Sequence, residues 1–361
     1  MMKKEDLRIV FMGTPEFAVE TLQALVEHDY NVVAVVTKPD KPVGRHGSVL
    51  QAPAVKKYAL EHGLPVLQPE KMKDENFVEQ LKSYNANLQV VVAFRMLPEV
   101  VWAMPEYGTF NVHAALLPQY RGAAPINWAI INGETQTGVT TFFLDHDIDT
   151  GRIIMSKPFD IPDDADVEYV YDGLMHLGAD LALETIDALI AAGGNIESMP
   201  QEKLIGEGVE LKSAPKIFKE TCRIDFHKPA KQVYDFVRGL SPYPGSWTEI
   251  KKKAPVVIFE DADGEMPEAT AHPAQQKSAA KIQVLKIFKT SLTEFSRGVA
   301  PVGSLRVFEK KLQVACLDHW LNIEELQLSG KKRMDAAAFL NGMKDIAYYE
   351  CQKAQETGEE W

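Results

Sequence analysis

Three polar side chains in the middle of the chain could stabilise a negatively charged oxygen and move a proton: Asn111, His113 and Asp149. Asn111 and His113 are two residues apart at the end of an apolar run, so on an extended strand both point to one face. Asp149 follows a second apolar run, in the sequence DHDIDTG. An amide, an imidazole and a carboxylate supply a hydrogen-bond donor and proton-transfer groups. No Ser or Cys stands between them, so they do not predict a hydrolase triad.

The same three residues also have an ordinary structural interpretation. A single His near the end of a strand is often a buried residue with no catalytic role. Asn and Asp are common in turns because their side chains bond to the nearby backbone. Residue type and spacing alone leave the catalytic and the structural interpretation open.

The elements that would position these residues alternate between strand and helix. A short apolar run over residues 7–12 ends at Gly13, and a helical pattern with Pro15 in its first turn and a strand over 31–36 follow. This β-α-β opening is typical of a doubly wound, Rossmann-like α/β fold. The glycines of a G-x-G-x-x-G motif are missing, so we expect no dinucleotide cofactor.

Further elements continue the alternation up to the polar residues. We expect helices over residues 54–61 and 77–84, strands over 65–67, 88–94 and 140–144, and a helix opened by Arg121-Gly122.

The length of 361 residues predicts two domains, because single cores seldom exceed about 250–300 residues. A long amphipathic helix over 166–192 stops at Gly193-Gly194, and residues 195–220 have the composition of a linker. One helix over 229–240 and several short strands then suggest a small OB-like β-barrel. The expected limits are 1–194 for the α/β domain, 195–220 for the linker, 221–345 for the barrel and 346–361 for an acidic tail.

Composition narrows the class of protein. Apolar residues make up 45% and charged residues 25%, as in ordinary globular proteins, and no apolar run is long enough for a membrane span or a signal peptide. The three cysteines are widely spaced and odd in number, which argues against disulfides and a zinc site, so we expect no metal. These features predict a cytoplasmic protein.

Charge is unevenly distributed along the chain. The net charge of −12 argues against a nucleic-acid partner, but basic residues cluster at 251–253, at 331–333, and around Lys281, Lys286 and Lys289. The segment 38–48, KPDKPVGRHGS, is rich in Pro, Gly and basic residues. It is either a solvated connection or an arm that offers Lys38, Lys41 and Arg45 to a polyanion, and the sequence leaves both open.

Five stretches together resemble the methionyl-tRNA formyltransferase family: FMGTPEFAV, NVHAALLPQYRGAAPINWAI, TGVTTFFLDHDIDTG, SPYPGSW and SGKKRM. The resemblance covers nearly the whole chain, from about residue 7 to 341. It implies transfer of a formyl group from 10-formyltetrahydrofolate to the amino group of initiator methionyl-tRNA, without a metal and by a monomer.

The resemblance also implies roles for particular residues. Asn111, His113 and Asp149 fall on the family's catalytic set, and Arg45 falls on the arginine of a loop that enters the tRNA acceptor region. Two segments are implied to line the folate site: Phe94 with Arg95, and the turn formed by Ala115, Leu116, Leu117 and Pro118.

The chain departs from the family pattern at both of these folate segments. Ala114-Ala115 stands where the family usually has Gly-Ser before the Leu-Leu-Pro turn, so a hydroxyl is absent. Ala93-Phe94-Arg95 stands where the family usually has Ala-Tyr-Gly.

Three other functions compete with tRNA formylation. A formyltransferase acting on an amino sugar would share the core but would not need a basic barrel domain. A hydrolase releasing formate from the same folate would need no acceptor. A non-catalytic RNA-binding protein would not need Asn111, His113 and Asp149 together.

Overall fold

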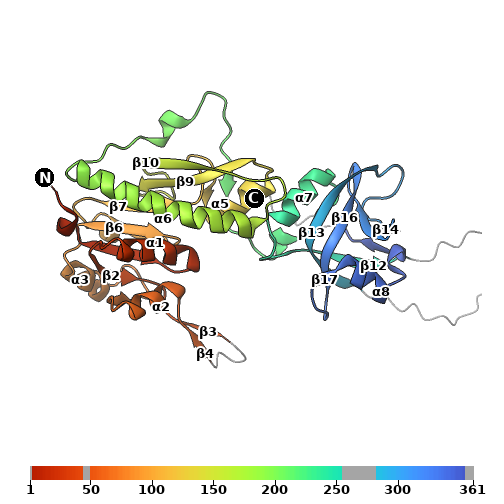
Figure 1. Ribbon diagram of the computed structural model, residues 1–361, viewed down its shortest axis with the longest axis horizontal. Helices are drawn as coiled ribbons and strands as arrows, with labels where there is room; N and C mark the ends of the chain where they lie inside the picture. The colour runs from red at the N-terminus through yellow and green to blue at the C-terminus, as the bar shows by residue number, and fades with distance from the viewer. Residues whose placement is uncertain (1, 44–48, 254–281, 354–361) are drawn as a thin grey trace, which may run out of the picture. The chain divides into compact units, whose positions relative to one another are not determined.

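The computed structural model describes residues 2–43, 49–253 and 282–353, which form two compact units, Met1–Ile217 and Phe218–Trp361. Figure 1 colours the first unit from red to green and the second from green to blue. Each unit has its own hydrophobic core.

The N-terminal unit is built on a seven-stranded sheet in the order β10-β9-β7-β6-β1-β2-β5. The five strands from β7 to β5 run parallel, whereas β9 is antiparallel to β7 and β10 is antiparallel to β9. The predicted doubly wound α/β fold is thereby confirmed. The strands are β1 (Ile9–Gly13), β2 (Val32–Val36), β5 (Val66–Leu67), β6 (Leu88–Val92), β7 (Thr109–His113), β9 (Gln136–Phe143) and β10 (Ile153–Asp160).

Helices cover both faces of this sheet because its central strands are apolar on both sides. One core joins α1, α2, α5 and α6, and a second core joins α3 and α4. Gly178 lets α6 approach the sheet closely, since a Cβ there would lie 3.3 Å from Val112. The helices are α1 (Glu16–Glu27), α2 (Ala54–Glu61), α3 (Glu75–Ser83), α4 (Glu99–Trp102), α5 (Pro125–Ile131) and α6 (Val167–Ala191). Among the described residues, no helix has both the length and the apolar character of a membrane span.

Two of the expected boundaries that differ from the structure have a clear local cause. The helix expected to open at Arg121-Gly122 begins at Pro125, because Arg121–Gly122 forms the short strand β8. The strand expected over 88–94 ends at Val92, since Ala93 turns the chain with a positive φ of 46°. Strand β10 was not predicted at all.

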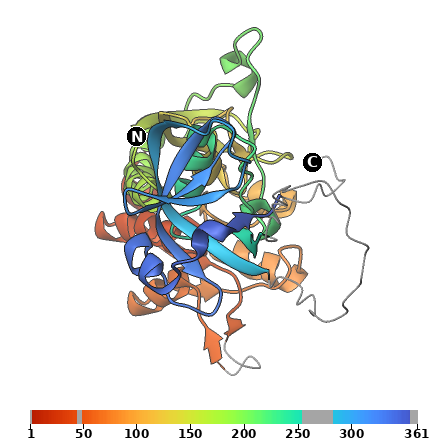
Figure 2. The same ribbon diagram turned by 90° about the vertical axis from the view of Figure 1, so that its right-hand side faces the viewer.

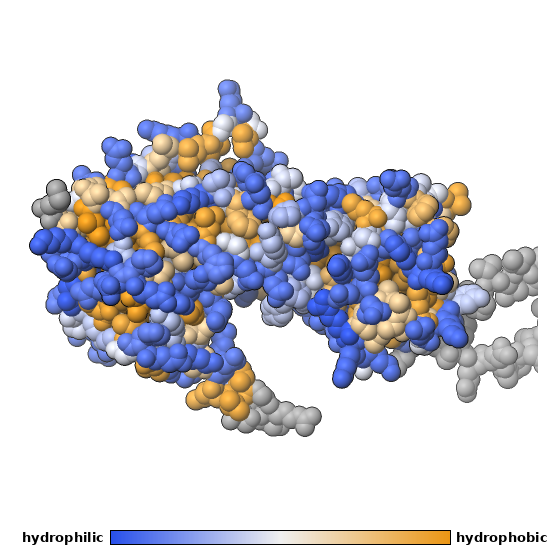
Figure 3. Space-filling view, viewed as in Figure 1, coloured by the Kyte–Doolittle hydropathy of each residue, from blue (hydrophilic) through white to orange (hydrophobic). Residues whose placement is uncertain are grey.

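The basic segment 38–48 contributes to a small hairpin. Strand β3 (Lys41–Val43) pairs antiparallel with β4 (Val49–Gln51), while Arg45 lies outside the described residues. Val49 and Leu50 are 58% and 68% exposed, and Figure 3 shows apolar atoms gathered on this hairpin. The hairpin therefore presents apolar as well as basic side chains to solvent.

The segment expected to be a linker is largely part of the N-terminal unit. Its residues up to Ile217 belong to that unit, and the strand β11 (Ser213–Ala214) pairs in parallel with β8. Gln201, in the 3-10 helix Gln201–Leu204, is completely buried. These contacts fix the segment to the N-terminal unit, whereas its composition predicted a linker.

The C-terminal unit is a nearly closed antiparallel barrel, which confirms the predicted small β-barrel. Its strands follow the order β14-β15-β16-β13-β12-β18, and a bridge between Ser304 and Glu350 brings the two ends of the sheet together. Figure 2 shows the blue strands crossing as the sheet curls. The elements are α7 (Ala230–Arg238), β12 (Ser246–Lys252), β13 (Gln283–Ser296), β14 (Leu305–Phe308), β15 (Lys311–Ala315), β16 (His319–Leu328), β17 (Met334–Asp335), α8 (Ala336–Gly342) and β18 (Tyr349–Cys351).

The barrel continues past residue 345, where the acidic tail was expected to begin. Strand β18 pairs with β12, and its Cys351 is buried in the barrel core. A strand expected over residues 256–259 lies outside the described part of the chain.

Two leucines, one buried and one exposed, test whether the apolar face of α1 packs in the core. Leu22 in α1 is 0% exposed and Leu60 in α2 is 59% exposed. Leu22→Ala should lower the free energy of unfolding of the N-terminal unit by about 2–5 kcal/mol, because it removes buried apolar contacts and leaves a cavity. Leu60→Ala should change it by less than about 0.5 kcal/mol. Chemical denaturation followed by circular dichroism measures both, and equal effects would contradict the packing.

Candidate active site

The three predicted polar residues line one cavity of about 580 Å³ in the N-terminal unit. Asn111 and His113 lie at the carboxyl end of β7, and Asp149 lies in the loop between β9 and β10. The strand order changes direction between β1 and β6, and ligand sites in open α/β sheets lie beside such a point at the carboxyl ends of the strands. The structure thus brings the amide, the imidazole and the carboxylate to one place.

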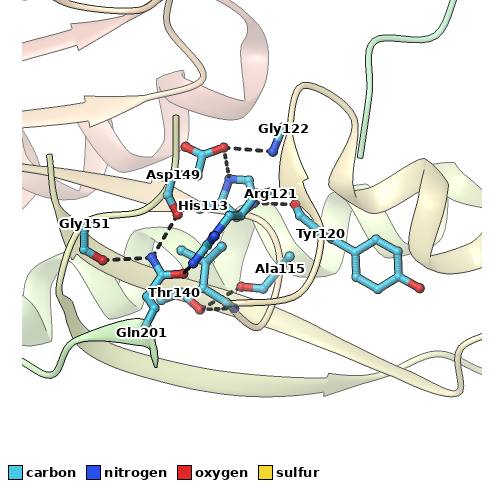
Figure 4. A network of polar contacts seen from close by, with 10 residues as sticks. His113, Ala115, Tyr120, Arg121, Gly122, Thr140, Asp149, Gly151 and Gln201 are labelled. Carbon is cyan, nitrogen blue, oxygen red and sulfur yellow. Dashed lines mark hydrogen bonds and ion pairs between the residues drawn. The ribbon is translucent and has the colours of Figure 1, made fainter. Parts of the chain in front are cut away.

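The His113 side chain is 6% exposed and has a defined orientation. Its Nε2 lies 2.9 Å from the backbone oxygen of Tyr120, and a carbonyl oxygen can only accept a hydrogen bond. Nε2 therefore carries a proton and donates a hydrogen bond to the Tyr120 carbonyl oxygen. In a neutral imidazole, Nδ1 is then the acceptor, and it lies 3.8 Å from Asp149 Oδ2 (Figure 4).

Tyr120 is itself held at several points, which positions the carbonyl that His113 uses. Its backbone adopts a left-handed φ of 60°, and its N–H donates to Lys212 O at 2.7 Å. Its hydroxyl donates to Glu134 at 2.5 Å, and Lys212 Nζ lies 2.6 Å from the same carboxylate oxygen. Burial and the bond to Glu134 raise the pKa of the Tyr120 hydroxyl, so it stays protonated as a donor.

Asp149 occupies a strained turn. Its φ is 55°, a left-handed conformation that residues with a side chain seldom adopt. Its Oδ2 accepts a hydrogen bond from Gly122 N at 2.9 Å. Gly151 completes the turn, because a Cβ there would lie 1.6 Å from Phe143 O. The Asp149 carboxylate is thereby directed toward His113.

Gln201 contacts the same turn from the segment that follows α6. Its Nε2 donates to Asp149 O and to Gly151 O, both at 2.8 Å. Its Oε1 accepts from Arg121 Nε at 3.0 Å and from a second Arg121 nitrogen at 2.7 Å. Figure 4 shows this amide between the Arg121 side chain and the backbone carbonyls of Asp149 and Gly151. Gln201 was not among the residues predicted from the sequence, because its segment has no strand or helix periodicity.

Asn111 completes the polar wall of the cavity. Within the described part of the chain its side-chain amide makes no hydrogen bond, although it is only partly exposed. An amide without an internal partner can donate to a bound molecule.

The turn formed by Ala115, Leu116, Leu117 and Pro118 lies behind the cavity rather than on its wall, which Ala114 reaches instead. Thr140 Oγ1 donates to Ala115 O at 2.7 Å and accepts from Leu117 N at 3.1 Å. Leu117 packs with Phe142 and Ile153. The turn supports the end of β7 from within the core, and its contact with folate stays a prediction.

Phe94 and Arg95 line the cavity, and their contact with folate stays a prediction. The Arg95 guanidinium lies over the Phe94 ring, 5.6 Å from its centroid. It donates to Glu70 O at 2.8 Å and also to Pro69 O. Its guanidinium is therefore anchored on the backbone, and burial lowers its pKa.

Lys38 and Lys41 lie in an electropositive neighbourhood of the N-terminal unit. Burial lowers the pKa of Lys38, and the positive charges of Lys41, Arg95 and Lys216 lower it further. An anion placed there would relieve this repulsion between cations.

Two threonines of β9 test the support of the turn behind the cavity. Thr140→Val removes both bonds to the turn and should lower the free energy of unfolding by about 1–3 kcal/mol, since Leu117 N and Ala115 O lose their partner. Thr137 is a matched control: its buried hydroxyl has no hydrogen-bond partner among the described residues. Thr137→Val should leave stability unchanged or raise it. Thermal melting of both variants measures the difference, and a Thr140→Val variant as stable as wild type would contradict the assigned role.

Comparison with known sequences places both units in one family. A family model described as formyl transferase matches residues 7–186, and one described as formyl transferase, C-terminal domain, matches residues 216–344. The chain is 56% identical over 349 residues to a methionyl-tRNA formyltransferase from Parabacteroides distasonis, covering 96% of this chain and 99% of the relative. It is 53% identical over 341 residues to one from Bacteroides fragilis, covering 94% and 96%.

Solved structures with low sequence identity share the fold. A sugar 3N-formyl transferase, WlaRD, aligns with a TM-score of 0.58 and 18% identity, covering 90% of this chain and 99% of that chain. An N-formyltransferase from Helicobacter canadensis aligns with a TM-score of 0.56 and 18% identity, covering 88% and 98%. With the two family models and the near full-length relatives, these matches show that the chain belongs to the methionyl-tRNA formyltransferase family.

Proposed function

We propose that this protein transfers the formyl group of 10-formyltetrahydrofolate to the amino group of initiator methionyl-tRNA. One observation carries the proposal: a buried imidazole and a carboxylate lie 3.8 Å apart, with an uncommitted amide lining the same cavity. The same residues stand in a chain 56% identical to a methionyl-tRNA formyltransferase over nearly its full length.

The cavity suits a folate cosubstrate in size and character. Its volume of about 580 Å³ lies within the range of small-molecule sites, about 300–1,000 Å³. Phe94, Leu97 and Trp102 give it apolar walls that fit a flat ring system. The Helicobacter canadensis relative in fold was solved with folinic acid, another formylated folate.

The three polar residues divide the chemistry of the transfer. The acceptor amine attacks the formyl carbon, and a negative charge develops on the formyl oxygen of the tetrahedral intermediate. We assign the Asn111 amide to donate to this oxygen, a contribution worth about 10²–10³ in rate. Breakdown of the intermediate breaks the bond to the folate nitrogen, which takes up a proton as it leaves.

The hydrogen bond to Tyr120 supports an inference about which nitrogen of His113 accepts the proton. Because Nε2 donates to Tyr120 O, a neutral His113 accepts the amine proton at Nδ1. The Asp149 carboxylate, 3.8 Å from Nδ1, stabilises the positive charge that forms on the ring. His113 is therefore the proposed base, with Asp149 supporting it.

The tRNA is proposed to contact both units. Lys38 and Lys41 form the electropositive neighbourhood at the hairpin, and Arg45 stands between its strands in the sequence. We assign these cations to the phosphates of the acceptor end. We assign the barrel to the rest of the tRNA, through the exposed Lys289 and Lys331 and the partly exposed Lys251.

Replacing the catalytic residues tests the assigned chemistry. Asn111→Ala, His113→Ala and Asp149→Ala should each lower kcat for formyl transfer by about 10²-fold or more while the fold is kept. Formylation of charged initiator tRNA by purified protein measures the rate, and circular dichroism checks the fold. His28→Ala, an exposed substitution at the end of α1, is the control and should keep the wild-type rate.

Alternative acceptors distinguish the competing functions in the same assay. Formylation of a nucleotide-linked amino sugar, or formate release without an acceptor, in preference to tRNA formylation would overturn the proposal. A variant of the catalytic set with near-normal rate would remove that residue from the set.

The hairpin cations should affect tRNA more than folate. Lys41→Ala and Arg45→Ala should each raise KM for tRNA several-fold, and they should weaken the dependence of tRNA binding on salt, because each removes a phosphate contact. KM for 10-formyltetrahydrofolate should change little. Lys57→Ala, on the exposed side of α2, is the matched control. Unchanged tRNA kinetics would contradict this role and would favour the other interpretation of segment 38–48, a solvated connection.

A further inference from the structure

We propose that Gln201 is a positioning residue for formyl transfer, which holds the Asp149 turn so that its carboxylate faces His113. This role rests on the proposed function, but the geometry behind it can be tested without activity. Gln201 does not line the cavity, so it acts through Asp149 and not by touching substrate.

Every polar atom of the Gln201 amide is used. Both hydrogens of Nε2 are donated, one to Asp149 O and one to Gly151 O, and Oε1 accepts two bonds from Arg121. The side chain is 0% exposed, so no water competes for these bonds. A buried amide with all its partners satisfied has a single orientation.

The Asp149 turn needs an external support of this kind. Its left-handed backbone is disfavoured for a residue with a side chain, and it persists only when its surroundings hold it. Gln201 binds the carbonyl oxygens on both sides of Thr150, which are those of Asp149 and Gly151. If these bonds are lost, the turn can relax to a negative φ and rotate the carboxylate away from His113.

The other end of the amide contacts the side chain of the residue before the carboxylate's hydrogen-bond donor. Arg121 precedes Gly122, whose N–H donates to Asp149 Oδ2 at 2.9 Å. Gln201 thus contacts the Arg121 side chain, next to the group that donates to the carboxylate, and binds the backbone of the turn that carries the carboxylate.

Two substitutions separate the functions of the amide. Gln201→Met keeps the length of the side chain and removes all four bonds. Gln201→Glu keeps the acceptor for Arg121 but cannot donate to Asp149 O or Gly151 O, and Arg121 balances its charge. Both variants should lower kcat about 10–100-fold, because small displacements of a catalytic group have effects of this size. KM for tRNA and for 10-formyltetrahydrofolate should stay within about threefold of wild type.

Gln89→Met is the matched control. Gln89 is also a buried glutamine of the N-terminal sheet, and its Oε1 accepts from Thr109 at 3.0 Å. This control should keep the wild-type kcat even where its melting temperature falls. A kcat loss for Gln89→Met equal to that for Gln201→Met would show a general stability effect and would overturn the proposal.

A double-mutant cycle shows whether Gln201 acts through Asp149. In an Asp149→Asn background, adding Gln201→Glu should slow single-turnover transfer by less than about threefold, because the group that it positions is already lost. Rate losses that multiply would overturn the proposal.

A crystal structure of Gln201→Glu gives a readout that is independent of activity. The expected result is a displaced Asp149 turn without the bond from Gly122 N to Oδ2. An unchanged turn would overturn the positioning role even if the rate falls. Wild-type protein that formylates no tRNA would instead overturn the proposed function, and this structural comparison would still decide the role of Gln201.

Discussion

The hydrogen bond from His113 Nε2 to the Tyr120 carbonyl determines which nitrogen of the imidazole can accept a proton. It fixes the proton on Nε2 and leaves Nδ1, which lies 3.8 Å from Asp149 Oδ2, as the acceptor. This position of the ring proton would be lost if the Tyr120 carbonyl could turn away. Glu134, which accepts from the Tyr120 hydroxyl, and Lys212, whose carbonyl accepts from the Tyr120 N–H, hold the residue in place. The geometry of one buried imidazole thus depends on residues more than twenty positions away in the chain.

The antiparallel strand β9 makes this arrangement compatible with the parallel sheet. It pairs with β7 over the residues that carry the polar groups, with His113 opposite Thr140. Thr140 then supports the turn after β7, and the loop after β9 returns Asp149 to the same end of the sheet. Because β9 runs antiparallel to β7, its last residue, Phe143, lies opposite Phe110, and the loop that carries Asp149 folds back from there toward His113.

Local patterns were sufficient for most of the fold and for part of the site. The apolar runs and their alternation with helical spacing predicted the sheet, the helix α2 with its observed ends and the barrel. The two-residue spacing of Asn111 and His113 correctly placed both at one cavity. What could not be predicted depends on distant backbone contacts: the pairing of β8 with β11, the burial of the turn 115–118, and the anchoring of Arg95 on Pro69 and Glu70. None of these leaves a periodic signal in its own segment.

The segment between α6 and the barrel has a consequence for how the protein can be divided. The two family models leave residues 187–215 unmatched, and these include Gln201 and Lys212, which bind the backbones of Asp149 and Tyr120. A chimera that joins this α/β domain to a foreign partner at the glycine pair after α6 would discard both anchors. Recombination between relatives should therefore succeed only when the crossover point falls beyond Ile217. The modular boundary of this protein lies some twenty residues later than its secondary structure suggests.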